Sequence, residues 1–280
     1  MDMTELDIRK PSGDFGIPER KADAVHRMLS KGRRHFGMPA ANLTLLDDPA
    51  VRERLPEKWK CDTLDDARRT HADVSGMFMD WMKDKPEAVL VDSVRVDGVE
   101  PGVDRDTGLM DVGFNDHVLI IGAHVLVIDS KAWKGGKDED HPSVYNQDDD
   151  GNVVKAGRAF AGSSLHITDD LQAWFNFIQA DLGKEPKNLF GMVVINADNV
   201  KVNRFKQWWN AVQTKYYALV EKERLVSQMD DWYGKIPDYE KTFISTDIVT
   251  QVVMRMCKPY NRRDHVINMK PLTHPRRTDA

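Results

Sequence analysis

The sequence predicts an α/β fold in which helices flank a mixed central β-sheet, and three observations lead to this prediction. Residues 118–121 and 125–128 are apolar, β-branched and Leu-rich runs around a Gly-Ala-His connection, as in a hairpin of two buried strands. Residues 189–196 form another apolar run of strand length. Between residues 63 and 85, apolar side chains recur at helical spacing until Lys85-Pro86 ends the helix.

The remaining elements are expected in the following order along the chain. Residues 1–17 are polar and contain Pro-Ser-Gly, so we expect a poorly ordered arm there. Further helices are expected at 18–36, 49–60, 167–182, 205–224 and 247–256. Further strands are expected at 88–96 and 242–245, with a loop at 99–108 and a second hairpin at 143–154.

Length, cysteine content and the first residues limit the class of protein. The chain has 280 residues, enough for one sizeable domain with extensions or for two small domains. Cys61 and Cys257 lie far apart without metal-ligand spacing, which fits a reducing compartment. No apolar run is long enough to span a bilayer, and the acidic, polar residues 1–5 do not form a secretory signal. We therefore expect a cytoplasmic protein without a membrane partner.

The charge distribution neither requires nor excludes a nucleic-acid partner. The formal net charge is −5 at pH 7, with acidic residues concentrated at 138–140 and 148–150. Basic residues are concentrated at 31–34 and 262–277. An enzyme that acts on DNA needs only a local cationic track, so the negative sum is weak counterevidence.

Three ionisable groups stand at the ends of the predicted hairpin. Asp116 opens its first strand, and Asp129 and Lys131 close its second strand. Because side chains alternate along a strand, Asp129 and Lys131 share one face while Ser130 lies on the other. An acid-x-Lys at a strand end is by itself usually a solvated edge or a simple ion pair, but Asp116 would reach the same place if the strands pair. Two carboxylates and one ammonium suit a hard divalent cation and phosphoryl chemistry.

This hairpin resembles the nuclease-related domain (NERD) family of the PD-(D/E)xK nuclease superfamily. The family's motif is an Asp-His pair opening a strand, a turn with Gly, a strand ending in acid-x-Lys, and a Gly shortly after. The same order is found here in Asp116-His117, Gly122, 125–128, Asp129-Ser130-Lys131 and Gly135-Gly136. Asp129 stands where the family more often has Glu. The resemblance covers about residues 70–200, and the predicted element order is the one expected of a restriction-endonuclease-like core.

The resemblance implies a deoxyribonuclease that depends on Mg²⁺ or Mn²⁺ and hydrolyses phosphodiester bonds in DNA. Asp116, Asp129 and the backbone carbonyl of Ser130 would bind the cation. Lys131 would orient or deprotonate the attacking water, or donate to the developing oxyanion. The chain would then divide into an N-terminal arm and helical extension (1–62), a nuclease-like core (63–258) and a basic C-terminal tail (259–280).

Weaker candidates each have a structural alternative. Asp73 stands where related helices carry an acid that approaches the metal, yet an acid on a helix surface fits equally well. Gln172 occupies a place where related nucleases have a Gln that contacts the substrate or the lysine, and a solvated helix Gln is the alternative. Candidate phosphate contacts, or simply solvated lysines, are Lys134, Lys137 and Lys206.

The sequence also points to two further residues and to a second class of function. His117 points away from Asp116 along the strand, so we expect a packed core histidine rather than a ligand. Glu87, which precedes the strand at 88–96, is a weaker option for a third carboxylate. The alternative function is a non-catalytic module on a decayed nuclease fold that binds nucleic acid or docks a partner. The N-terminal helices and the C-terminal tail are the expected docking surfaces for a protein partner.

Overall fold

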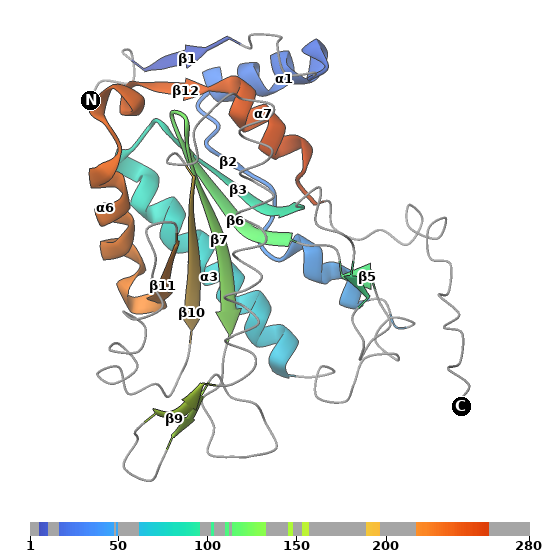
Figure 1. Ribbon diagram of the computed structural model, residues 1–280. Helices are drawn as coiled ribbons and strands as arrows, with labels where there is room; N and C mark the ends of the chain where they lie inside the picture. The colour runs from blue at the N-terminus through green and yellow to red at the C-terminus, as the bar shows by residue number, and fades with distance from the viewer. Residues whose placement is uncertain are drawn as a thin grey trace, which may run out of the picture.

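A six-stranded mixed sheet lies at the centre of the protein (Figure 1). The computed structural model describes residues 6–10, 17–47, 49, 62–95, 114–132, 189–196 and 217–257, together with the backbone of four short strands outside these ranges. From edge to edge the sheet contains β11 (Tyr217–Glu221), β10 (Leu189–Asn196), β7 (His124–Ala132), β6 (Phe114–Ile121), β3 (Ala88–Arg95) and β2 (His35–Phe36). The two central pairs, β7–β6 and β6–β3, are antiparallel, and the outer pairs are parallel. The α/β class with a mixed sheet is therefore confirmed, and its restriction-endonuclease-like type stays a prediction.

The β6–β7 hairpin forms where the apolar runs predicted it, and contacts with Glu240 fix its turn. Gly122 has φ +56°, in the left-handed region that favours glycine, and an added Cβ would overlap the backbone and the carboxylate of Glu240. The same carboxylate accepts a hydrogen bond of 2.8 Å from the backbone N–H of Ala123. The turn is thereby tied to η7 (Asp238–Thr242).

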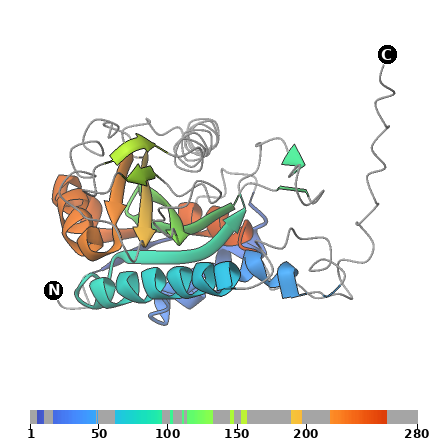
Figure 2. The same cartoon turned by 90° about the horizontal axis from the view of Figure 1, so that it is seen from below.

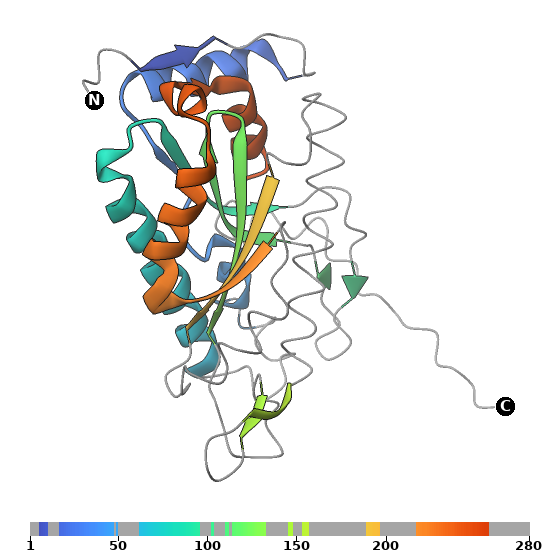
Figure 3. The same ribbon diagram turned by 60° about the vertical axis from the view of Figure 1, so that its left-hand side comes forward.

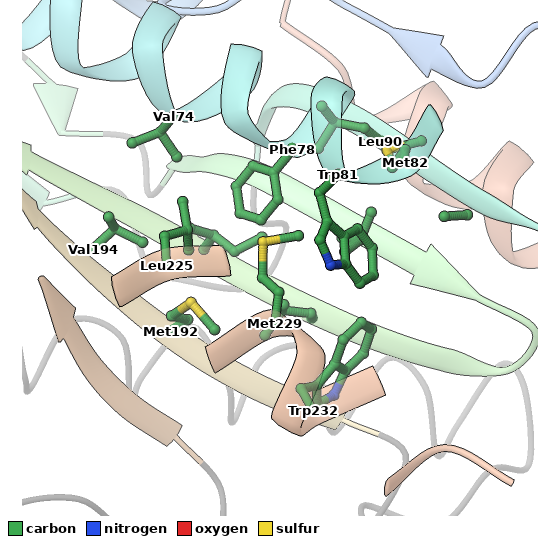
Figure 4. Packing of buried hydrophobic residues seen from close by; sticks show 14 of the residues in the cluster. Val74, Phe78, Trp81, Met82, Leu90, Met192, Val194, Leu225, Met229 and Trp232 are labelled. Carbon is green, nitrogen blue, oxygen red and sulfur yellow. The ribbon is translucent and has the colours of Figure 1, made fainter. Parts of the chain in front are cut away.

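Two helices cover one face of the sheet and enclose the main core. These are α3 (Asp62–Trp81), which η4 (Met82–Asp84) extends, and α6 (Leu225–Lys235), which follows η6 (Lys222–Arg224). Figure 2 shows α3 running along the sheet, and Figure 3 shows α3 and α6 side by side on the same face. Val74, Phe78 and Trp81 of α3 meet Leu225, Met229 and Trp232 of α6 above alternate residues of the strands (Figure 4). Burying a side chain as large as Phe78 contributes about 2–3 kcal/mol to stability.

The other face is packed by α7 (Thr246–Met254), which contacts β3 and β6. Against α7 lies α1 (Glu19–Ser30), and β1 (Asp7–Arg9) pairs in parallel with β12 (Phe243–Ser245). Part of the expected N-terminal arm is thus a strand, and the expected extension at 1–62 contributes β2 to the central sheet. The described N-terminal segments, which include η2 (Ala41–Asp47), pack with the core.

Several predicted elements differ from the structure. The helix expected at 205–224 is wrong for residues 217–224, which form β11 and η6, because the apolar run at 217–221 pairs in parallel with β10. The first helix ends at Ser30 rather than 36, and the glycine that follows, Gly32, has φ +86°. The loop expected at 99–108 includes β4 (Gly102–Val103), which pairs with β5 (Met110–Asp111). The second hairpin is confirmed as β8 (Tyr145–Gln147) and β9 (Val153–Ala156). Residues 50–60 and the helix expected at 167–182 lie outside the described residues.

The lengths and apolar character of the helices can be compared with those of a membrane-spanning helix. In the described part of the chain, no helix has both the length and the apolar character needed to cross a bilayer.

Candidate functional site

The ladder between β6 and β7 ends before either strand does, and the candidate site lies at this opening. Its last pair joins His117 to Ile128. Beyond it, β6 stays paired with β3 as far as its first residue, and β7 stays paired with β10 as far as its last. The two middle strands therefore separate, and their facing backbone groups need other partners. Asp116 supplies one, because its Oδ2 accepts a hydrogen bond of 2.6 Å from the backbone N–H of Ser130.

Asp116 and Asp129 come together in this opening. Asp129 is the residue that would pair with Asp116 if the ladder continued, and both side chains are buried. Lys131 Nζ donates a hydrogen bond of 2.7 Å to Asp129 Oδ1, while 31% of the lysine side chain is exposed. The structure thus brings together the two acids and the amine that the hairpin pattern placed at one end of the sheet. Their roles in metal binding and catalysis stay predictions.

The surroundings of Asp129 disfavour its charged form. Burial raises the pKa of Asp129 to about 6, the ammonium of Lys131 opposes this rise, and the neighbouring Asp116 carboxyl adds to it. Two carboxyl groups with one ammonium between buried strands leave an excess of negative charge. A cation placed between the carboxylates would remove this excess.

On the opposite face of β7, Ser130 belongs to a buried polar network under α3. Its Oγ lies 3.1 Å from His117 Nε2, and His117 Nδ1 lies 2.7 Å from Asp92 Oδ1. Asp92 Oδ2 accepts hydrogen bonds of 2.7 Å from Ser75 Oγ and 2.7 Å from His35 Nε2. Burial alone would raise the pKa of Asp92, but the hydrogen bonds from His117, His35 and Ser75 outweigh it and hold this pKa well below its usual range.

Asp92, His117 and Ser130 have the order of contacts of a serine-hydrolase triad, but their position excludes that role. All three side chains are buried inside the sheet–helix core, so a substrate carbonyl has no access to the Ser130 hydroxyl. The backbone N–H of the same serine is directed at Asp116. His117 is therefore a packed core histidine, as its place on the strand predicted.

His71 of α3 approaches the site from the helix layer. Its Nε2 lies 3.3 Å from Asp116 Oδ2, and its Nδ1 is buried without a hydrogen-bond partner among the described residues. Burial lowers the pKa of His71 to about 3, with further contributions from nearby His117 and Lys131. The imidazole is therefore neutral at pH 7, and its Nε2 faces the Asp116 carboxyl group.

Two of the weaker candidates lie away from the acid pair. The Asp73 side chain is 55% exposed and forms an ion pair of 3.0 Å with Lys222 Nζ. Glu87 stands at the opposite end of the hairpin sheet, where its Oε1 accepts a hydrogen bond of 2.6 Å from the Tyr233 hydroxyl. Gln172 and the three candidate phosphate contacts Lys134, Lys137 and Lys206 lie outside the described residues, as does the C-terminal tail.

Sequence reasoning missed His71, Ser75 and Asp92, although each had a local signal. His71 and Ser75 flank Val74 at positions three before and one after it, within the inward-facing helical stripe. Asp92 interrupts an apolar strand on the face that also buries Leu90. A polar side chain in such a position needs a buried partner, which is the pattern that would have marked all three.

The donor set limits which cation could bind. Among the described residues, no group of three or more His, Cys, Asp and Glu side chains is arranged to hold a metal ion. Two carboxylates with a backbone carbonyl and waters nevertheless suit Mg²⁺ or Mn²⁺, which prefer oxygen ligands and keep several waters. The excess negative charge between Asp116 and Asp129 fits such an ion.

Comparisons of this chain with protein-family models, with curated proteins and with solved structures gave no match. Conclusions about its chemistry therefore depend on the geometry of the site.

Proposed function

We propose that this protein is a metal-dependent nuclease that hydrolyses phosphodiester bonds in DNA. The observation that supports it is the meeting of Asp116, Asp129 and Lys131 where the two central strands separate. The resemblance of this hairpin to NERD and PD-(D/E)xK nucleases points to the same activity, and a restriction-endonuclease-like core belongs to the same proposal.

In the proposed site, Asp116 and Asp129 would hold Mg²⁺ or Mn²⁺ together with the Ser130 carbonyl. Bound there, the cation would lower the pKa of a water molecule and neutralise charge on the phosphate. The water oxygen attacks phosphorus, the bond from phosphorus to one sugar oxygen breaks, and that oxygen takes up a proton. The products are a phosphate monoester and a hydroxyl end.

Lys131 has the reach for a role in this reaction. Its ammonium already contacts Asp129, and the exposed part of its side chain leaves it open to a phosphate at the rim. It would orient the attacking water or donate to the charge that develops on the phosphate oxygens. A group that acts in the transition state affects the rate more than it affects DNA binding.

The test compares two lysines at the same end of the sheet. Purified protein is incubated with linear, circular and single-stranded DNA in Mg²⁺ or Mn²⁺, with and without EDTA. We expect degradation that EDTA abolishes, and a loss of at least about 100-fold in Lys131→Ala with DNA affinity retained. Lys222→Ala, which removes the partner of exposed Asp73, is the control and should keep its rate. An undiminished rate in Lys131→Ala would reject the assignment.

The alternative is a non-catalytic module that binds nucleic acid or docks a partner. Two observations favour it. Asp129 already pairs with Lys131, and no group of three or more His, Cys, Asp and Glu side chains in the described part of the chain is arranged to hold a cation. Calorimetry with Mn²⁺ separates the two functions. A nuclease site should bind Mn²⁺ and lose this affinity in Asp129→Ala, whereas a decayed site should bind none.

A further inference from the structure

A chain of buried hydrogen bonds leads from β3 to Ser130, the residue whose backbone N–H donates to Asp116. Asp92, His117 and Ser130 stand on neighbouring strands β3, β6 and β7 and share the face that α3 covers. An ionised Asp92 can only accept hydrogen bonds, so His117 Nδ1 is the donor to it. On its other side the same ring contacts the Ser130 hydroxyl, with 3.1 Å between His117 Nε2 and Ser130 Oγ.

The far end of this chain is fixed by several elements. Asp92 also accepts from Ser75 of α3 and from His35 of β2, so its carboxylate is held by three donors from three elements. A charge-assisted hydrogen bond is shorter and stronger than a neutral one, and a buried network in which every member is satisfied is rigid. The position of the His117 ring, and with it that of the Ser130 side chain, is therefore determined from the core.

The near end reaches the proposed site through one residue. On one face of β7, the Ser130 hydroxyl contacts His117 and so belongs to the network. The backbone N–H of Ser130 donates to Asp116 Oδ2 in the opening between β6 and β7. We infer that Asp92, His117 and Ser130 are positioning residues that orient the Asp116 carboxylate and the Ser130 carbonyl for the cation. This inference rests on the proposed function.

A purely structural role would not require these residue types. Replacing buried polar groups by well-packed apolar ones is often neutral or stabilising, so stability alone gives no reason to place a charged group at Asp92. What an apolar residue could not do is fix the Ser130 hydroxyl, and through it the strand segment that contacts Asp116. Groups that orient metal-binding carboxylates typically change metal affinity or activity by about 10–100-fold when they are removed.

The test removes one hydroxyl and then restores it. Ser130→Ala deletes the Oγ and keeps the backbone N–H, and Ser130→Thr returns a hydroxyl at the same atom position. Thr250→Val is the control, because it removes a fully buried hydroxyl of α7 that has no hydrogen-bond partner among the described residues. For each variant, Mn²⁺ affinity is measured by calorimetry, kcat and KM on DNA are measured at fixed Mn²⁺, and thermal melting reports folding.

We expect Ser130→Ala to weaken Mn²⁺ binding and lower kcat by about 10–100-fold, with KM for DNA unchanged. Ser130→Thr should recover most of this loss, and Thr250→Val should show none of it. If Ser130→Ala melts like the control and binds Mn²⁺ as tightly as the wild type, the positioning role is refuted. If instead the wild type itself binds no Mn²⁺, the proposed function fails, and the two failures are thereby distinguished.

Discussion

Asp129→Asn should make the folded protein more stable at pH 8 in the absence of divalent cations. The raised pKa of Asp129 means that the folded protein retains this proton at pH values where the unfolded chain has already lost it. The unfolded state therefore binds fewer protons between about pH 4 and pH 6, and stability falls as the pH rises through this window. Above pH 6 the full penalty of a buried carboxylate is present, and an amide does not have it.

The size of the effect follows from the shift. A rise from 3.8 to about 6 is about two pKa units, and one unit corresponds to about 1.4 kcal/mol, so the ionised side chain costs about 3 kcal/mol at pH 8. Substitution also removes the ion pair between Asp129 and Lys131, but the lysine side chain is partly exposed, so losing this ion pair costs little. We expect a gain of about 1–3 kcal/mol at pH 8 that shrinks to less than about 1 kcal/mol at pH 4.

Urea unfolding in EDTA at pH 4 and pH 8, followed by tryptophan fluorescence, measures this difference. Trp81 and Trp232 lie in the main core and report its exposure. The matched control is Asp73→Asn, an exposed acid on α3, whose effect should be within about 0.5 kcal/mol at both pH values. If Asp129→Asn unfolds more easily than the wild type at pH 8, or if its gain is equal at both pH values, the reasoning about burial and charge is refuted.

Three further predictions concern the scaffold of the site. Asp92→Asn should lower stability by about 3–5 kcal/mol at pH 7, because it removes the charge from a buried carboxylate that accepts three hydrogen bonds. The pKa of Asp92 is depressed in the folded protein, so the stabilisation by its charged form is present above about pH 4. In urea titrations below that pH, the difference between the variant and the wild type should shrink. Gly37→Ala should cost about 1–3 kcal/mol in thermal melts, since the residue has φ +87° and an added Cβ would lie 2.5 Å from the Asp92 carbonyl oxygen. Gly76→Ala, with open space in α3, should instead stabilise by about 1 kcal/mol, and a loss there would contradict this explanation.

The elements that local pattern predicts well are those whose pattern and packing agree. The hairpin at 114–132 contains two apolar runs, strand β10 contains another, and α3 has an apolar stripe at helical spacing. Strand β11 has the local pattern of a helix because its five residues follow a long run without Gly or Pro, and only its parallel pairing with β10 decides its structure. Local propensity cannot predict this pairing, because β10 lies more than twenty residues away in the sequence.

The acid pair could be predicted because it lies within one hairpin, whereas its support could not. Asp116 and Asp129 are 13 positions apart and joined by a single turn, so strand alternation alone brings them together. His35 and Asp92 are 57 positions apart, and Ser75 reaches Asp92 from a helix. These contacts depend on the order of the strands in the sheet and on the helix that covers it, which no local pattern specifies.

The register of one strand determines both the site and its support. In β7, Ile128 and Ser130 face α3, while Asp129 and Lys131 face the other way, so a slip by one residue would bury the charged pair under the helix. The apolar residues Leu126 and Ile128 oppose such a slip because they would lose the core. At the far end of the hairpin, the hydrogen bond from Ala123 to Glu240 fixes the turn. The same apolar burial that stabilises the sheet therefore places the two carboxyl groups together in the opening between the strands, where their charges repel and where we propose that a cation binds.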